Sequence, residues 1–368
     1  MNPSMLSRKT LHELPMTVHG GQAWKIGGIE DYSHNLNPFG PPDDIKDIIS
    51  SSIEGIDHYP DDNSTELKEA ISERFHVGME NIIIGAGSSD IIRMFPNTFI
   101  EDGETVIIPS PSFAEYTHQC RIVGARVFTQ DLESKDDFHM DFDSLKSKID
   151  DNVKAIYICN PNNPTGRIER REDILDLVEY CGDKGTFVFL DETLLELVPE
   201  HKDISCIEYV DRYPNLLVAG SLTKSFAIPG IRIGFGFSNP ETIGELNKVR
   251  MTWNVGQIEQ KVATELIRNR MGHVEKAAAL MASEARWMYQ QLTDIGLPIR
   301  MTDSYFFFDS MRPLGMDGHQ FVERMLKNNI MVRDCASFGM RFTDYVRFCV
   351  KDRIRNERFV EAARNALR

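Results

Sequence analysis

At 368 residues the chain is long enough for about two domains, and 41% hydrophobic with 26% charged residues is typical of a soluble enzyme. No apolar run approaches the roughly 20 residues of a membrane helix, and residues 1–21 lack a signal-peptide core, so we expect a cytoplasmic protein. The net charge of -15 disfavours nucleic-acid and membrane partners, and six scattered cysteines without a CxxC pair argue against disulfides and zinc.

Two stretches near the start are rich in turn-forming residues. His19-Gly20-Gly21 combines an imidazole with paired glycines, whose backbone N–H groups can approach a ligand closely, although a plain turn fits the pattern equally well. The segment 31–42, which contains Asn37, is dense in proline and glycine and predicts an extended crossing between domains.

The first helical pattern covers residues 63–75, where Asn63 or Ser64 can serve as the N-cap. A short apolar strand at 81–84 then runs into a glycine turn and a new helix that begins near Ser88 and Ser89. A strand, a glycine turn and a helix start form an anion site, because free N–H groups point at one spot. The third glycine of a dinucleotide motif is absent, so the pattern indicates one phosphate or a purely structural turn.

Strands at 105–109 and 155–159 are each followed by residues suited to a binding site. Phe113 and Tyr116 follow the first strand and either stack on a flat ligand or fill the core. The second strand ends in Asn160-Pro161-Asn162-Asn163-Pro164-Thr165-Gly166, a rigid loop that would hold the Asn163 amide where ligands gather in parallel sheets. A helix is predicted at 171–182.

Two further strands deliver the most reactive groups. The strand at 186–190 ends in Asp191, a carboxylate that needs a partner if it is buried. The strand at 216–220 ends in a hydroxyl-rich turn with Lys224, whose neutral amine would attack an aldehyde if burial removed its charge. Lysine alone is more often a surface residue. Ser221, Thr223 and Arg232 are donors suited to a phosphate, and residues 231–237 predict another strand.

The pattern changes after about residue 270. A long helix at 274–295 precedes strands at 305–308 and 345–350 and helices at 317–328 and 354–367. Arg333 and Arg347 lie among apolar residues here, and Arg347 either faces solvent or holds a carboxylate with its guanidinium fork. Strands alternating with helices predict an α/β fold with a mostly parallel central sheet and helices on both faces.

We predict three regions: an N-terminal arm with part of a small domain at 1–45, a large α/β domain at 46–273, and a small α+β domain at 274–368. The strand ends of the large domain together supply an amine, a carboxylate, an amide, an aromatic ring and a phosphate cradle. Pyridoxal 5'-phosphate (PLP) requires these contacts for its aldehyde, ring nitrogen, phenolic oxygen, ring face and phosphate.

Over nearly its whole length the sequence resembles the fold-type-I PLP enzymes of the aminotransferase class I and II group. The motifs are the loop 160–166, Asp191 after its strand, and Ser221-x-x-Lys224 followed by Arg232. The resemblance implies that Lys224 binds the aldehyde, Asp191 the ring nitrogen and Asn163 the phenolic oxygen. It also implies the other cofactor contacts, which are Ser88, Ser89, Phe113, Ser221, Thr223 and Arg232.

The resemblance further implies a homodimer and a substrate pocket. Tyr59 matches a tyrosine that members donate to the phosphate across the dimer interface, and Arg347 matches the arginine that binds the substrate carboxylate. Substrate contacts are expected from two arginines of the C-terminal region and from residues near the N-terminus. These residues are Arg333, Arg347, His19, Gly20 and Asn37.

Within the group, the sequence is most similar to histidinol-phosphate aminotransferase and to the threonine-phosphate decarboxylase of cobalamin synthesis. The N-terminal segments and the spacing of Arg333 and Arg347 favour decarboxylation of L-threonine O-3-phosphate to 1-amino-2-propanol phosphate. Leu194 also favours it, because aminotransferases usually have there a tyrosine that bonds the phenolic oxygen, a contact worth about 1 kcal/mol. The alternatives are the aminotransferase, coupled to 2-oxoglutarate, and a non-catalytic PLP-binding regulator, for which no basic DNA-binding extension is visible.

Overall fold

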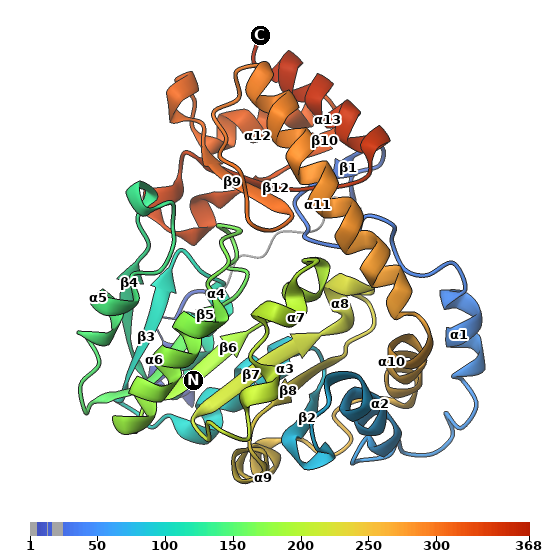
Figure 1. The fold of residues 1–368 in the computed structure, drawn as a ribbon, viewed down its shortest axis with the longest axis vertical. Coiled ribbons are helices and arrows are strands. Elements are labelled where there is room, and N and C mark those ends of the chain that lie inside the picture. The colour runs from blue at the N-terminus through green and yellow to red at the C-terminus, as the bar shows by residue number, and fades with distance from the viewer. Residues whose placement is uncertain (1–5, 13, 17–24) are drawn as a thin grey trace.

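A seven-stranded sheet forms the centre of the larger part of the molecule (Figure 1). The computed structural model describes residues 6–12, 14–16 and 25–368. The strands of this sheet are β2 (Ile82–Gly85), β3 (Thr105–Ser110), β4 (Arg126–Asp131), β5 (Val153–Cys159), β6 (Phe187–Asp191), β7 (Leu216–Ser221) and β8 (Gly234–Phe237).

The strand order is β2-β8-β7-β6-β5-β3-β4, and the strands from β7 to β4 pair in parallel. β8 is antiparallel to both of its neighbours, β2 and β7. This confirms the predicted mostly parallel sheet, in which carboxyl ends of neighbouring strands share one edge. The carboxyl ends of β5, β6 and β7 therefore lie in a row.

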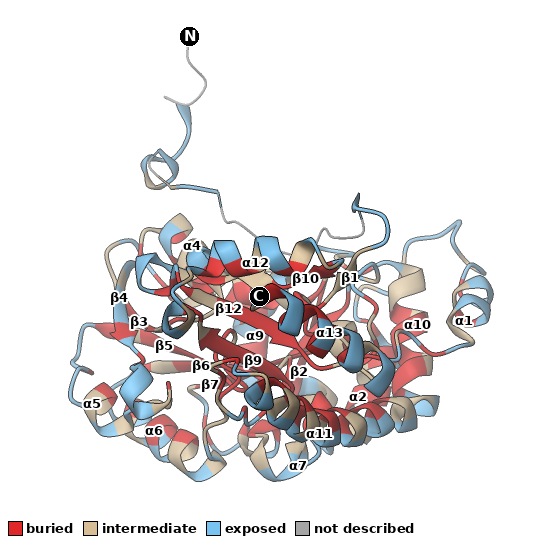
Figure 2. Cartoon of the chain, turned by 90° about the horizontal axis from the view of Figure 1, so that it is seen from above, coloured by how far each residue is buried: buried red, intermediate tan, exposed pale blue. Residues whose placement is uncertain are grey.

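Helices cover both faces of the sheet, because the side chains of each strand alternate between two cores. In β5, Ile156 and Ile158 belong to one buried cluster, whereas Ala155 and Tyr157 belong to the other. Figure 2 shows these buried strands between partly exposed helices. The first cluster includes α2 (Thr65–Phe75), α6 (Arg171–Asp183) and α10 (Gln257–Asn269), and the second includes α3 (Ser88–Phe99), α4 (Ala114–Val123) and α9 (Pro240–Val249).

The C-terminal part forms a smaller α+β unit above the large sheet in Figure 1. It contains an antiparallel sheet in the order β11-β12-β9. The short strand β1 (Glu30–Asp31) pairs in parallel with β10 (Ile330–Met331), so the chain near residue 30 is attached to this unit. The other elements are β9 (Phe306–Ser310), β11 (Arg333–Asp334), β12 (Tyr345–Cys349), α11 (Met271–Asp294), α12 (Gly318–Leu326) and α13 (Arg353–Ala366).

Some local details differ from the sequence expectations. The Asp61 carboxylate, rather than a side chain at 63 or 64, accepts from the Thr65 N–H (2.7 Å) at the start of α2. β4 has no continuous apolar run because it is an edge strand with mostly exposed residues. The remaining α-helices are α1 (Ile45–Ser51), α5 (Phe142–Lys146), α7 (His201–Ile204) and α8 (Leu222–Ser225).

Within the described ranges, no helix combines the length and apolar character that a membrane crossing requires.

Candidate functional site

Strand register brings the predicted phosphate-binding residues together. Because β8 is antiparallel, its first residue, Gly234, pairs with Gly85 at the end of β2 and with Ser221 at the end of β7. Only two residues lie between the end of β2 and Ser88, where α3 begins, and one residue lies between Arg232 and β8. The motifs at 85–90 and 221–232 thus converge, although more than 130 residues separate them in sequence.

Two glycines allow a close approach at this point. A Cβ atom on Gly87 would lie 2.3 Å from Nη2 of Arg232, and one on Gly234 would lie 2.2 Å from the backbone N of Ser88. Gly87 also has φ of 85° and ψ of 163°, a conformation that is nearly restricted to glycine. The start of α3, including Ser88 and Ser89, therefore offers free N–H groups beside a guanidinium, which is suited to a phosphate.

A Gly87→Ala substitution is expected to weaken phosphate binding here and to lower the free energy of unfolding by about 1–3 kcal/mol, from backbone strain. Denaturant unfolding and equilibrium dialysis with a phosphate ligand measure the two effects. Gly103→Ala is the matched control, because Gly103 has φ of 86° but open space around the new Cβ. Equal loss of phosphate affinity in both variants would contradict the proposed cradle.

Ser221 and Thr223 are tied to each other and to β8. The Ser221 hydroxyl donates to the Ile233 carbonyl (3.0 Å), and the Thr223 N–H donates to Ser221 Oγ (3.1 Å). Ser221 thereby acts as the N-cap of α8. These contacts fix the start of the short helix that carries Lys224.

Asp191 lies at the carboxyl end of β6 and is 4% exposed. The Tyr116 hydroxyl donates to its Oδ2 (2.6 Å), and the Thr193 N–H donates to its Oδ1 (2.9 Å). Burial raises the pKa of Asp191, although these hydrogen bonds and the charge of Lys224 oppose the rise. A buried carboxylate in this setting is stabilised by a cationic partner. Tyr116 fills the core, which was one of its two predicted roles, and its hydroxyl also orients this carboxylate.

Lys224 lies in α8, directly beyond the end of β7. Burial lowers the pKa of its amine to about 8, and the positive charges of Arg347 and Arg232 contribute further. The neutral fraction of this amine near neutral pH is therefore much larger than that of an ordinary lysine, whose pKa is near 10.4. The sequence prediction of a desolvated amine agrees with this environment.

The pKa of Lys224 leads to a pH-dependent reactivity. Below pH 8 the amine is mostly protonated and unreactive, and above pH 8 it is mostly neutral. Reductive labelling of the cofactor-free protein with formaldehyde, quantified for each lysine by mass spectrometry, should show Lys224 levelling off above about pH 8. A labelling rate that continues to rise like that of an ordinary lysine beyond pH 9.5 would contradict the low pKa.

Asn37 holds the backbone of the Lys224 segment through two hydrogen bonds. Its side-chain N–H donates to the Ser225 carbonyl (2.7 Å), and its backbone N–H donates to the Lys224 carbonyl (3.0 Å). Asn37 is 3% exposed and is not among the residues that line the cavity at Lys224. In the structure Asn37 thus has a structural role, and its expected substrate contact stays a prediction.

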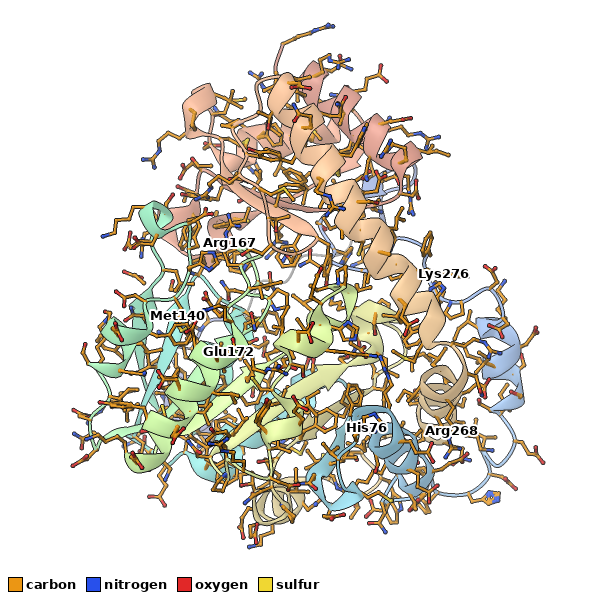
Figure 3. The ribbon with its side chains drawn as sticks, in the orientation of Figure 1. His76, Met140, Arg167, Glu172, Arg268 and Lys276 are labelled. Atoms are coloured by element: carbon orange, nitrogen blue, oxygen red, sulfur yellow. The ribbon has the colours of Figure 1, made fainter. Side chains whose placement is uncertain are left out.

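The Asn163 loop is held by Arg167, which Figure 3 labels between the large sheet and the C-terminal unit. Arg167 donates to the Met301 carbonyl (2.8 Å) and to Asp303 Oδ1 (3.1 Å), and it forms an ion pair with Asp137 (2.7 Å). Its carbonyl accepts from the Asn162 N–H (2.8 Å). The loop is thus fastened to both parts of the molecule, which fixes the Asn163 amide at the carboxyl end of β5.

A cavity of about 260 Å³ opens where these groups meet. Five predicted site residues line it: Phe113, Asn163, Lys224, Arg333 and Arg347. Leu194, which is 5% exposed, also lines it. Its remaining lining residues, which the sequence did not single out as ligand contacts, are Ser33, His34, Asn35, Ala114, Ser337 and Phe338.

Arg347 is the most deeply buried cation of this cavity, at 8% exposure. It donates to Asn163 Oδ1 and to the Ser33 carbonyl, while its Nε has no hydrogen-bond partner. Among the described residues no carboxylate pairs with it, and burial lowers the pKa of its guanidinium. A buried unpaired charge is costly, so this arrangement favours an anionic ligand.

Among the described residues, Tyr59 does not belong to this cluster. Tyr59 is 76% exposed and stacks on Trp253, with ring centroids 4.3 Å apart, away from the cavity lining of its own chain. His19 and Gly20 lie outside the described residues.

A second cavity of about 270 Å³ is lined by Ser221, Glu192 and Glu196 but not by Lys224. Glu192 accepts from the Ser205 hydroxyl (2.6 Å) and the Cys206 N–H (2.8 Å), and burial raises its pKa to about 7. The cavity at Lys224 is the better candidate site, because amine, amide and two arginines converge there.

Comparisons with known proteins identify the family of this chain. The sequence model of the family "Aminotransferase class I and II" matches residues 29–362. A histidinol-phosphate aminotransferase of Moorella thermoacetica is 28% identical over 92% of this chain and 86% of its own length. A protein of Caldanaerobacter subterraneus with the provisional name threonine-phosphate decarboxylase is 31% identical over 92% of each chain. The crystal structure of the Clostridium acetobutylicum histidinol-phosphate aminotransferase superposes with a TM-score of 0.84, at 26% identity, over 92% of this chain and 98% of that one.

Proposed function

Because the chain belongs to the aminotransferase class I and II family, it is a PLP-dependent enzyme, and we propose that it decarboxylates L-threonine O-3-phosphate. The product would be 1-amino-2-propanol phosphate. The family sets the cofactor and the general chemistry, whereas the reaction and the substrate are inferred from the cavity.

The residues around Lys224 fit PLP. The N–H groups of Ser88 and Ser89, beside Arg232, suit its phosphate, and the space above Gly87 that a Cβ would fill allows the close approach. The buried Asp191 carboxylate suits a protonated ring nitrogen, because the two charges would offset each other's desolvation.

The other cofactor contacts are distributed around the same cavity. Asn163 would donate to the phenolic oxygen, Phe113 would pack on the ring face, and the amine of Lys224 would hold the aldehyde carbon. When bound, PLP accepts the electron pair that bond cleavage leaves at the substrate Cα.

The chain's own residues would select which bond breaks. Arg347 would bind the substrate carboxylate, and Arg333 would bind the phosphate at the other end of the substrate. These two contacts would fix the orientation of the Cα–carboxylate bond and so favour its cleavage. After loss of CO2, Lys224, which lines the cavity, would return a proton to Cα.

Leu194 is the observation that carries the choice of decarboxylation. It lines the cavity together with Lys224 and Asn163, at the position where aminotransferases of this group have a tyrosine. The apolar side chain cannot donate a hydrogen bond to the phenolic oxygen, which leaves that task to Asn163. The environment therefore differs from that of an aminotransferase at one defined contact.

Transamination of histidinol phosphate is the second candidate. The names of the Moorella relative and of the Clostridium structure support it, and names of this kind prevail among the relatives, which makes this candidate the stronger one by comparison alone. The same residues would act, but Lys224 would remove the Cα hydrogen instead of returning a proton after CO2 loss.

One experiment separates the two candidates. The PLP-loaded enzyme is incubated with L-threonine O-3-phosphate, and in parallel with histidinol phosphate plus 2-oxoglutarate, and the products are identified by mass spectrometry. Release of CO2 and 1-amino-2-propanol phosphate in the first incubation supports the proposal. Formation of glutamate in the second, without CO2 release in the first, refutes it in favour of the aminotransferase.

We also propose that the enzyme is a homodimer in which Tyr59 reaches the cofactor phosphate of the partner subunit. The exposed pair of Tyr59 and Trp253 supports this, because stacked aromatic rings at the surface are typical of interfaces. Sedimentation analysis of the purified protein tests the assembly, and a monomer at micromolar concentration would contradict it.

A further inference from the structure

The segment that follows β1 lies directly beside Arg333 and Arg347. β1 pairs with β10, so Asp31 lies opposite Met331, and the Tyr32 N–H donates to the Met331 carbonyl (2.8 Å). Because the two strands run in parallel, the residues that follow β1 and β10 continue in the same direction. Arg347 donates to the Ser33 carbonyl. The residues after Tyr32 consequently form a wall of the cavity at Lys224.

His34 is the ionisable residue of this wall, and a carboxylate holds its ring. Its Nε2 lies 2.8 Å from Asp31 Oδ2, and the side chain of His34 is 30% exposed. Asp31 is fixed in turn, because its Oδ1 accepts from the Ser33 N–H (2.8 Å) and the Ser33 hydroxyl (2.6 Å). Burial would raise the pKa of Asp31, but the hydrogen bonds from His34 and Ser33 lower it overall.

The ionised Asp31 determines which ring nitrogen of His34 can meet a ligand. A carboxylate at Nε2 keeps that nitrogen protonated and leaves Nδ1 for a second partner. Because His34 lines the cavity, a ligand there has access to a ring that is already oriented. In its protonated form the oriented ring can donate from Nδ1 to the ligand with little further loss of rotamer freedom.

Arg333 and Ser337 line the same cavity as His34. Nη2 of Arg333 donates to Ser337 Oγ (2.7 Å), and its guanidinium lies 6.0 Å from the centre of the Phe338 ring. These contacts orient the guanidinium. A hydroxyl, a guanidinium and an imidazole are the donors that a phosphate dianion prefers.

We propose that His34, held by Asp31, forms with Arg333 and Ser337 a subsite for the distal phosphate of the substrate, and that His34 determines selectivity for phosphorylated substrates. This rests on the proposed function, in which Arg347 engages the carboxylate. The subsite is chemically separate from the cofactor cradle at Ser88 and Arg232. A substrate without the phosphate would not contact these donors.

Kinetics of His34→Gln in the PLP-loaded enzyme test the proposal. We expect kcat/KM for L-threonine O-3-phosphate to fall about 10- to 100-fold, mainly through KM, because a charge-assisted hydrogen bond is lost. kcat/KM for unphosphorylated L-threonine should fall by a clearly smaller factor. Asp31→Asn should lower kcat/KM for L-threonine O-3-phosphate less than His34→Gln does, since the imidazole remains. His139→Gln is the matched control, because His139 also pairs with carboxylates but does not line the cavity.

An arm that does not need turnover uses inorganic phosphate as the probe. Addition of phosphate to the PLP-loaded protein should shift the ring signals of His34 in NMR spectra, with a weaker apparent affinity in Asp31→Asn. An unchanged preference for the phosphorylated substrate in His34→Gln would overturn the proposal. Phosphate binding that leaves the ring signals of His34 unchanged would also overturn it. If the wild-type enzyme processes no phosphorylated substrate, the proposed function fails, and the phosphate titration alone then decides about the subsite.

Discussion

Replacement of Lys224 by alanine is expected to abolish the covalent attachment of PLP and to reduce turnover by a factor on the order of 10³ or more. A proton-transfer group alone contributes about 10²–10⁴ in rate, and Lys224 would have a second role in holding the cofactor. The wild-type protein should be yellow, should lose its colour on borohydride reduction, and should then carry the cofactor mass on the peptide containing Lys224. The variant should show no such adduct.

Lys248→Ala is the matched control for Lys224→Ala. The side chain of Lys248 is 69% exposed and pairs with Glu245 on α9, far from the cavity lining. The Lys248→Ala variant should keep the yellow colour, the borohydride-stable adduct on Lys224 and full turnover. A borohydride-stable adduct on any other lysine, or full activity of the Lys224 variant, would show that the reactive amine has been misassigned.

Replacement of Arg347 by lysine is expected to lower kcat/KM by about 10²-fold or more, with little change in cofactor content. Removing one partner of a buried charged hydrogen-bond pair costs about 2–5 kcal/mol, and lysine lacks the fork that binds a carboxylate through two parallel hydrogen bonds. Lysine preserves the positive charge in the cavity, so the free energy of unfolding should change less than in Arg347→Ala. Steady-state kinetics and denaturant unfolding separate these effects.

The control for Arg347→Lys is Arg312→Lys, because the side chain of Arg312 is 79% exposed although it also pairs with a carboxylate, that of Asp344. The control should behave like the wild type. An Arg347→Lys enzyme with unchanged kcat/KM would contradict the assignment of this guanidinium to the substrate carboxylate.

The site could be predicted from the sequence where it depends on the ends of strands. Each apolar run at 155–159, 186–190 and 216–220 became a strand, and the parallel pairing of β5, β6 and β7 placed their carboxyl ends together. Asn163, Asp191 and Lys224 are close in space because of this rule and not because of contacts between their side chains. The turn at Gly87 and Ser88 could also be predicted, because it joins the end of a strand to the start of a helix.

Other features depend on tertiary contacts that local patterns do not encode. The direction of β8 decides that Arg232 meets Gly87, yet the apolar pattern of a strand is the same in both directions. Tyr116 bonds Asp191 across 75 residues, and an aromatic residue on a helix face gives no sign of such a partner. His34 and Asn37 lie in one irregular segment, but their neighbours are set by the pairing of β1 with β10. Knowledge of the strand pairing would have been needed to predict the neighbours of Arg232 and of the segment with His34 and Asn37.

The fate of the substrate carboxyl carbon tests the account most directly. L-Threonine O-3-phosphate labelled at that carbon is given to the PLP-loaded enzyme with 2-oxoglutarate present, and labelled CO2 and glutamate are counted in the same sample. We predict at least ten molecules of CO2 for each glutamate, with both signals absent in Lys224→Ala. Retention of the label in a 2-oxo acid, with glutamate as the main product, would contradict decarboxylation and identify the enzyme as an aminotransferase.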